Sequence, residues 1–198
     1  MTFSKGLRWS LGLLLAATAV IILMILSGMN DPKPVGELVQ ERPLFPQIAA
    51  PESSRITWLD EPLPEEDYSV RLTAAQEPEG DSRQGKDVGY GLVLGEGERY
   101  LAVAVSPLGY LSVWQETGQD THFILPWQTW PHVRRDLETN EIWLDVEHSD
   151  QLTIRINREW LWTGEVESLT GQIGLFAESF GETAVIDFQT LRLWDFRE

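Results

Sequence analysis

From Arg55 to the C-terminus, the chain consists of short runs of β-branched and aromatic residues in which apolar and polar side chains alternate. In Glu141–Glu147, the apolar residues at even-numbered positions face one way, while the acidic residues and Trp143 face the other. Leu152–Ile156 alternates in the same manner. A period of two indicates strands that have one face on a core and the other on solvent. The sequence therefore predicts an all-β sandwich or barrel.

Eleven such runs are separated by Gly, Pro, Asp or Asn, residues that favour turns. The segment Asn157-Arg158-Glu159, between two of the runs, predicts a tight hairpin. The predicted strands are Ile56–Leu59, Tyr68–Thr73, Tyr90–Leu94, Tyr100–Val105, Tyr110–Gln115, His122–Leu125, Ile142–Glu147, Leu152–Ile156, Trp160–Trp162, Gln172–Ala177 and Val185–Trp194.

The N-terminal region differs in character. Trp9 to Met29 is a stretch of 21 residues without a charge, close to the roughly 20 residues that cross a bilayer as a helix. We interpret residues 9–29 as a transmembrane helix. A cleaved secretory signal is the alternative, but its apolar core is usually about 7–15 residues long. Lys5 and Arg8 precede the span, so residues 1–8 are expected to stay in the cytoplasm as a basic tail.

This interpretation predicts a single-pass protein of the cytoplasmic membrane with its C-terminal domain on the extracytoplasmic side. Trp9 lies where an interfacial aromatic side chain is favoured. Gly12, Ala16 and Ala19 are small residues that would allow close contact with other membrane helices. The expected partners of this segment are therefore the lipid bilayer and, in one alternative, other membrane subunits.

Residues 30–54 contain five prolines, and Pro62 and Pro64 follow. Proline at that density argues against a helix or a central strand. We therefore predict a semi-rigid spacer over 30–54, followed by the sandwich over 55–198. The alternative is a segment that packs along its own domain, which apolar residues such as Leu44 and Phe45 would allow.

Charge and cysteine content exclude several classes of function. The chain has 15 basic and 31 acidic side chains, and none of the acids lies in residues 1–29. This acid excess argues against nucleic acid as a partner. The absence of cysteine excludes disulfides, thiolate metal sites and thiol nucleophiles. No cofactor or metal is expected; the acidic loop from Glu77 to Asp87 offers oxygen ligands for calcium but lacks EF-hand spacing.

Several ordered segments are similar to strands of one known family. They are Tyr90–Val93, Tyr100–Ser106, Gly109–Val113, Asn140–Val146, Leu152–Asn157, Gly171–Ala177 and Val185–Leu191. Together they resemble concanavalin A-like lectin/glucanase domains, the jelly-roll class that includes laminin-G-like modules. Arg158 and Gln189 depart from the glycine and asparagine usual at those points. The resemblance implies a jelly-roll β-sandwich, and members of the class bind glycans, bind proteins or act as glycosidases.

The segment Glu141–Glu147 also resembles a glycosidase motif of the same fold class, in which three acids alternate along one strand. Here Trp143 occupies the position of the middle acid. Asp145 and Glu147 remain, about 6.6 Å apart along a strand, which falls within the range for inverting glycosidases. Because one acid is missing, we expect no enzyme activity and interpret the acidic face as solvated.

Trp127 and Trp130 are the stronger candidates for binding. They lie three residues apart in a segment bracketed by Pro126 and Pro131, which predicts a loop. Exposed indoles would offer flat apolar faces to sugar rings or to a protein partner. The alternative is that one or both fill the end of the sandwich.

The sequence thus predicts a non-catalytic recognition module, with cell-envelope carbohydrate as the ligand class that the resemblance implies. The predicted ligand- or partner-binding residues are Trp127, Trp130, Trp143, Asp145 and Glu147. The first alternative is an accessory subunit of a membrane complex, which packs through its transmembrane helix and caps the complex with its β-sandwich. The second alternative is a degenerate glycoside hydrolase.

Overall fold

The computed structural model describes residues 3–26, 36–65, 67–118, 120–167 and 169–196. They divide into two compact units, with the boundary after Lys33. The first contains helix α1 (Phe3–Leu26). The strands of the second unit are β1 (Glu37–Pro43), β2 (Gln47–Ala49), β3 (Ser53–Pro62), β4 (Tyr68–Gln76), β5 (Val88–Glu96), β6 (Arg99–Val105), β7 (Tyr110–Thr117), β8 (Thr121–Thr129), β9 (Asn140–Glu147), β10 (Gln151–Ile156), β11 (Glu159–Glu165), β12 (Gln172–Ser179) and β13 (Ala184–Asp195).

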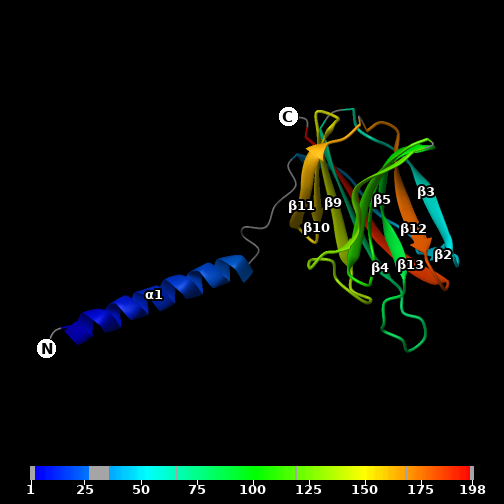
Figure 1. Cartoon of the computed structure of the whole chain (residues 1–198). Helices are drawn as coiled ribbons and strands as arrows, with labels where there is room; N and C mark the ends of the chain where they lie inside the picture. The colour runs from blue at the N-terminus through cyan, green and yellow to red at the C-terminus, as the bar shows by residue number, and fades with distance from the viewer. Residues whose placement is uncertain (1–2, 27–35, 66, 119, 168, 197–198) are drawn as a thin grey trace. The chain divides into compact units, whose positions relative to one another are not determined.

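The strands form two antiparallel sheets that pack as a sandwich (Figure 1). Sheet A has the order β1-β13-β4-β9-β10-β11, with β2 also paired to β13. Sheet B has the order β3-β12-β5-β6-β7-β8. Strands distant in the sequence are neighbours in both sheets, as with β13 beside β4 and β12 beside β5. The predicted all-β sandwich is confirmed.

The main core lies between the sheets and is built from the inward-facing residues of the alternating strands. Leu72 on β4, Leu92 on β5 and Leu144 on β9 are fully buried there. A second apolar cluster lies on the outer face of sheet B, where Trp114 and Phe176 cover Val93 and small alanines. Their rings meet edge to face with centroids 5.1 Å apart. Sheet B therefore carries aromatic side chains on its outer face as well.

Each of the eleven predicted runs lies within an observed strand. The predicted hairpin between β10 and β11 is also present, with Asn157 and Arg158 at φ values of 53° and 75°. Two consecutive positive values are typical of the tight two-residue turn that matches strand twist. Arg158 therefore adopts a conformation that usually favours glycine or asparagine.

The predicted spacer over residues 30–54 differs from the structure. Glu37–Pro43 is strand β1, which pairs antiparallel with β13 at the edge of sheet A, and Gln47–Ala49 is strand β2. The segment from residue 37 onward therefore packs along its own domain, as the alternative interpretation held. An edge strand tolerates Pro43 at its end because the outer side of an edge needs no backbone donor. Residues 30–35 lie outside the described residues.

Helix α1 covers most of the predicted membrane span, and Trp9, Gly12, Ala16 and Ala19 all lie on it in exposed positions. In the described part of the chain, however, no helix has the length and apolar character needed to cross a membrane. The prediction of a transmembrane helix is therefore not supported. Residues 27–29, the end of the predicted span, are outside the described residues.

Candidate functional site

A pocket of about 370 Å³ lies at one end of sheet B, and we call it the Trp127 pocket. Its residues come from four separate connections and strands of that sheet. Asp87 immediately precedes β5, Trp127 belongs to β8, and Phe180 follows β12. The remaining lining residues belong to the β6–β7 connection and the start of β7: Ser106, Leu108 and Tyr110. The volume is within the range of about 300–1,000 Å³ typical of small-molecule sites.

The Trp127 ring is held by close packing on two sides. On one side it lies against Gly89 of β5, where an added Cβ would be 3.0 Å from the ring. It also meets Phe180 edge to face, with ring centroids 6.0 Å apart. The backbone N–H of Phe180 in turn donates to the carbonyl of Asp87. Gly89 therefore allows the edge of the indole to approach β5 closely, and Phe180 packs against the ring.

The β6–β7 turn forms another wall of the pocket. The Ser106 N–H donates to the Tyr110 carbonyl at 2.8 Å, and the Ser106 hydroxyl accepts from the Leu108 N–H at 3.2 Å. Gly109 has a φ of 88°, a left-handed value that favours glycine. Its carbonyl accepts from the Trp130 N–H, which ties the turn to the end of β8. Hydrogen bonds within the turn and to the end of β8 therefore hold the turn in place.

The pocket combines apolar surfaces with polar groups. Tyr110 is 40% exposed and Phe180 is 46% exposed, so both present aromatic surface beside Trp127. Asp87, which is exposed, supplies a carboxylate, and Ser106 supplies a hydroxyl at the wall. Aromatic faces bind the apolar faces of sugar rings, while carboxylates and hydroxyls bind their hydroxyl groups. This arrangement can bind a small polyhydroxylated ligand.

The Glu178 carboxyl, near the pocket, has a raised pKa. Burial, together with the negative charge of Asp87, raises the pKa of the Glu178 carboxyl above its ordinary value. Glu178 lies on β12, two residues before Phe180. The edge of the pocket therefore places two acidic side chains near each other.

The structure separates the two tryptophans that the sequence grouped together. The predicted loop is wrong for Trp127, because strand β8 continues through it to Thr129, whereas Trp130 lies in the connection after the strand. Both are partly buried: Trp127 lines the pocket and packs on the second apolar cluster, whereas Trp130 packs against the main core. The alternative interpretation, a side chain that fills the end of the sandwich, is therefore the one the structure gives for Trp130.

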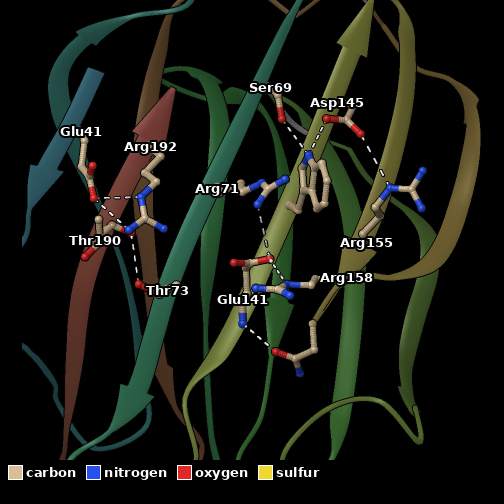
Figure 2. Close-up of polar contacts among 12 residues, drawn as sticks. Glu41, Ser69, Arg71, Thr73, Glu141, Asp145, Arg155, Arg158, Thr190 and Arg192 are labelled. Atoms are coloured by element: carbon tan, nitrogen blue, oxygen red, sulfur yellow. Dashed lines mark hydrogen bonds and ion pairs between the residues drawn. The ribbon is translucent and has the colours of Figure 1, made fainter. Parts of the chain in front are cut away.

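The outer face of sheet A, shown in Figure 2, differs from the solvated acidic face that was predicted. Trp143 points away from the core but is 1% exposed, because the Arg71 guanidinium from β4 lies 3.3 Å from its ring centroid. The Trp143 indole N–H donates to the Ser69 hydroxyl and to the Asp145 carboxylate. Trp143 therefore has no free ring face to offer a ligand in this conformation.

Asp145 and Glu147, the two acids of the glycosidase-like motif, lie in different surroundings. Asp145 accepts from the Trp143 indole and lies 3.8 Å from the Arg155 guanidinium, while Glu147 is exposed at the end of β9. Trp143, at the place of the middle acid, precedes both on β9 and is buried. The roles predicted for Asp145 and Glu147 as binding residues stay predictions.

The acidic loop from Glu77 to Asp87 contains its own cation. Lys86 forms ion pairs with Glu79 and Glu182 and donates to the Thr183 carbonyl. Across the described ranges, no group of three or more His, Cys, Asp or Glu side chains is arranged to hold a metal ion.

Comparisons with known proteins show the fold. No protein-family model matches the chain, and no curated protein matches it. Among solved structures, carbohydrate-binding module CBM66 from Bacillus subtilis has a TM-score of 0.54 at 10% identity, and the match covers 79% of this chain and 98% of that one. The exoplasmic/lumenal domain of VIP36 in its Ca²⁺/Man2-bound form has a TM-score of 0.52 at 14% identity, over 78% and 79% of the two chains.

A third similar structure belongs to an enzyme. The β-fructofuranosidase of Aspergillus kawachii, complexed with glycerol, has a TM-score of 0.51 at 11% identity, over 79% of this chain but 27% of that one. These likenesses show a lectin-like β-sandwich. At such low identity they show the fold alone.

Sequence reasoning found Trp127 but missed the residues around it. Asp87, Ser106 with Tyr110, and Phe180 lie in three different parts of the chain and share no motif. One signal was available, the pair Gly89 and Gly91 within a strand, because glycine inside a strand often marks a close approach of another group.

Proposed function

We propose that this chain is a non-catalytic carbohydrate-binding module and that the Trp127 pocket is its sugar site. The observation that carries the proposal is the grouping of Trp127, Tyr110 and Phe180 around a pocket that also contains a carboxylate and a hydroxyl. Two proteins of similar fold support it by their descriptions, one as a carbohydrate-binding module and one in a form bound to Man2.

The proposed mode of binding follows from the geometry of the pocket. A sugar ring would lie against the part of the Trp127 indole that lines the pocket, away from the ring edge that faces Gly89. The Asp87 carboxylate would accept hydrogen bonds from sugar hydroxyls, and bonds to charged groups are the stronger ones. Ligand specificity would then depend on which hydroxyl groups reach Asp87 and Ser106.

The proposal is tested by glycan-array screening of the full-length chain, followed by calorimetric titration of the best neutral glycan. Replacement of Trp127 by alanine is expected to weaken binding by about tenfold or more, as for the loss of one buried aromatic contact. Phe45→Ala is the matched control, because Phe45 is 80% exposed and does not line the pocket. Equal affinities of the Trp127→Ala variant and the unaltered chain would overturn the site.

A second variant tests positioning without removing the ring. Gly89→Ala adds a methyl group 3.0 Å from the Trp127 ring, so the indole must move by a few tenths of an ångström. We expect a smaller loss of affinity than for Trp127→Ala, with the fold retained.

We also propose an extracytoplasmic location at the cytoplasmic membrane. This rests on the sequence of residues 1–29, with Lys5 and Arg8 ahead of an uncharged stretch. Alkaline carbonate extraction of native membranes, followed by protease treatment of intact cells, tests it. Release of the full-length chain into the carbonate supernatant would refute a membrane anchor, and protection of the domain in intact cells would refute the location.

A further inference from the structure

A single row of side chains crosses the whole outer face of sheet A, and we call it the arginine row. Its members are direct cross-strand neighbours on six successive strands. In spatial order they are Glu41 on β1, Arg192 on β13, Arg71 on β4, Trp143 on β9, Arg155 on β10 and Trp160 on β11. Three of the six residues are arginines, in a chain whose formal net charge is −16.

The central arginine of the row is buried without hydrogen bonds to satisfy it. Arg71 is 9% exposed and lies between two indoles, 3.3 Å from the Trp143 ring centroid and 4.8 Å from that of Trp194. Its Nε and Nη2 atoms are buried, with no hydrogen-bond partner among the described residues. Burial lowers the pKa of the Arg71 guanidinium, since the charged form is desolvated. A buried unsatisfied cation is costly and calls for a compensating anion or polar ligand.

The protein's own carboxylates only partly compensate this charge. Glu141 Oε1 lies 4.0 Å from Arg71 and 3.9 Å from Arg158, and Asp145 lies 3.8 Å from Arg155. These separations are ion-pair distances but exceed hydrogen-bond length. Arg155 Nε is likewise buried without a hydrogen bond. Figure 2 shows these guanidinium and carboxylate groups gathered on β4, β9 and the β10–β11 hairpin.

Like charges also lie directly opposite each other in the row. Arg192 and Arg71 are cross-strand partners, an arrangement that destabilises a sheet in the absence of a compensating anion. Arg192 itself is paired with Glu41, at 2.8 Å. Arg192 therefore contributes less than burial does to the lowered pKa of Arg71.

The cluster opens to solvent at the β10–β11 hairpin. The Arg158 side chain is 55% exposed and that of Arg155 is 25% exposed, so solvent reaches part of both side chains. Arg158 is held at a φ of 75°, a strained value for a residue with a side chain.

An exposed aromatic side chain adjoins the arginines. Trp160 is 57% exposed and is the cross-strand neighbour of Arg155. Its indole N–H donates to the Thr163 hydroxyl at 2.9 Å, which orients the ring. The Thr163 hydroxyl is also 2.9 Å from that of Thr153 on β10. An oriented indole beside guanidinium groups suits a ligand with both an apolar ring face and a negative charge.

We propose that the arginine row and Arg158 form a second ligand site, which binds the carboxylate of an acidic saccharide. The carboxylate would pair with Arg155 and Arg158, with the buried charge of Arg71 behind them, and the sugar ring would lie against Trp160. The proposal rests on the proposed function in one respect, that the ligand is a saccharide. Its site and its charge requirement are independent of the Trp127 pocket.

The test uses the full-length chain and three probes: a galacturonic acid trimer, the neutral galactose trimer and a glutamate tripeptide. Calorimetric titration at low ionic strength is expected to show the acidic trimer binding at least about tenfold more tightly than the neutral one, from one added charge-assisted contact. Added salt is expected to weaken only that preference. Equal binding of the two trimers would overturn the proposal, and equal binding of the glutamate tripeptide would overturn the saccharide assignment.

Two variants separate binding from folding. Arg158→Gln is expected to weaken acidic-trimer binding by about tenfold. Arg158→Gly is expected to do the same while leaving the domain folded, because glycine relieves the positive φ. Arg55→Gln, at an exposed arginine of sheet B, is the matched control and is expected to change nothing. Unaltered binding in both Arg158 variants would overturn the site.

Failure of this proposal is distinct from failure of the proposed function. The Trp127→Ala variant is expected to lose neutral-glycan binding and to keep the preference for the acidic trimer. If Trp127→Ala abolished both while the Arg158 variants altered neither, the chain would have a single sugar site and the second site would be refuted.

Discussion

Asn140 is the residue whose removal should destabilise this domain most clearly. It is 1% exposed and lies at the start of β9, where it connects three segments. Its Oδ1 accepts from the Arg134 N–H and from Asn157 Nδ2, both at 2.8 Å. Its Nδ2 donates to the Arg134 carbonyl and to the buried Tyr90 hydroxyl, both at 3.0 Å. We predict that Asn140→Ala will remove all four bonds at once.

The magnitude follows from those contacts. A net contribution of about 1 kcal/mol per hydrogen bond gives a loss near 4 kcal/mol in the free energy of unfolding. The Tyr90 hydroxyl, on a fully buried side chain, would lose its hydrogen-bond partner. Leaving a buried polar group unsatisfied lowers the free energy of unfolding by more than the loss of an average hydrogen bond does. Burial already raises the pKa of Tyr90 to about 12. A total of this size is at the upper end for single substitutions.

Urea unfolding of the full-length chain, followed by tryptophan fluorescence, measures the change. Tyr90→Phe is the control, since it removes one of the four bonds and should cost about 1 kcal/mol. The double variant should then show a coupling of similar size. A loss below about 1 kcal/mol for Asn140→Ala would refute the reasoning, because it would mean that water replaces the amide without cost.

The network also matters for the candidate site. The segment after Trp130 contains Asp136, whose N–H donates to the Pro107 carbonyl and whose side chain accepts from the Gly85 N–H. Pro107 belongs to the turn that lines the Trp127 pocket with Ser106 and Leu108. Asn140 thus holds the loop that supports this turn, and its loss should weaken neutral-glycan binding as a secondary effect.

Two further predictions concern sheet B. The folded protein keeps the proton of Glu178 to a higher pH than the unfolded chain does, because burial and Asp87 raise its pKa. The free energy of unfolding should therefore fall as the pH rises from the ordinary glutamate pKa through the raised one. Urea melts at several pH values should show that Glu178→Gln removes this fall. The same pH dependence in the variant and the unaltered chain would contradict the prediction. Gly91→Ala would place a methyl group against the Val103 carbonyl of the neighbouring strand, and thermal melts should show a loss of at least about 3 kcal/mol, whereas an unchanged midpoint would contradict the close approach.

Much of the fold could be predicted because its signals are local. Each run of alternating apolar and polar residues lies within an observed strand, and Asn157 with Arg158 forms the predicted hairpin turn. The strand at Glu37–Pro43 was missed, because its pairing with β13 depends on residues about 150 positions later, as in the bond between Glu41 and Arg192. Proline content alone could not show that the segment lies at a sheet edge.

The candidate site was predictable only in part. A tryptophan in a strand or turn has the same sequence signature whether it lines a pocket, as Trp127 does, or packs on the core, as Trp130 does. The difference depends on which distant residues lie beside each ring. Phe180 and Gly89 set the position of Trp127, and neither is near it in the sequence.

The sequence by itself determined the strand pattern, the acidic charge and the absence of cysteine chemistry, because these depend on residue type and local spacing. Which side chains are accessible depends on the packing of the folded domain. Trp143 alternates with buried core residues and was expected to face solvent, yet Arg71 covers its ring and Ser69, 74 positions earlier, accepts its indole N–H. Accessibility depends on partners brought together by sheet pairing, and a two-residue period contains no information about those partners.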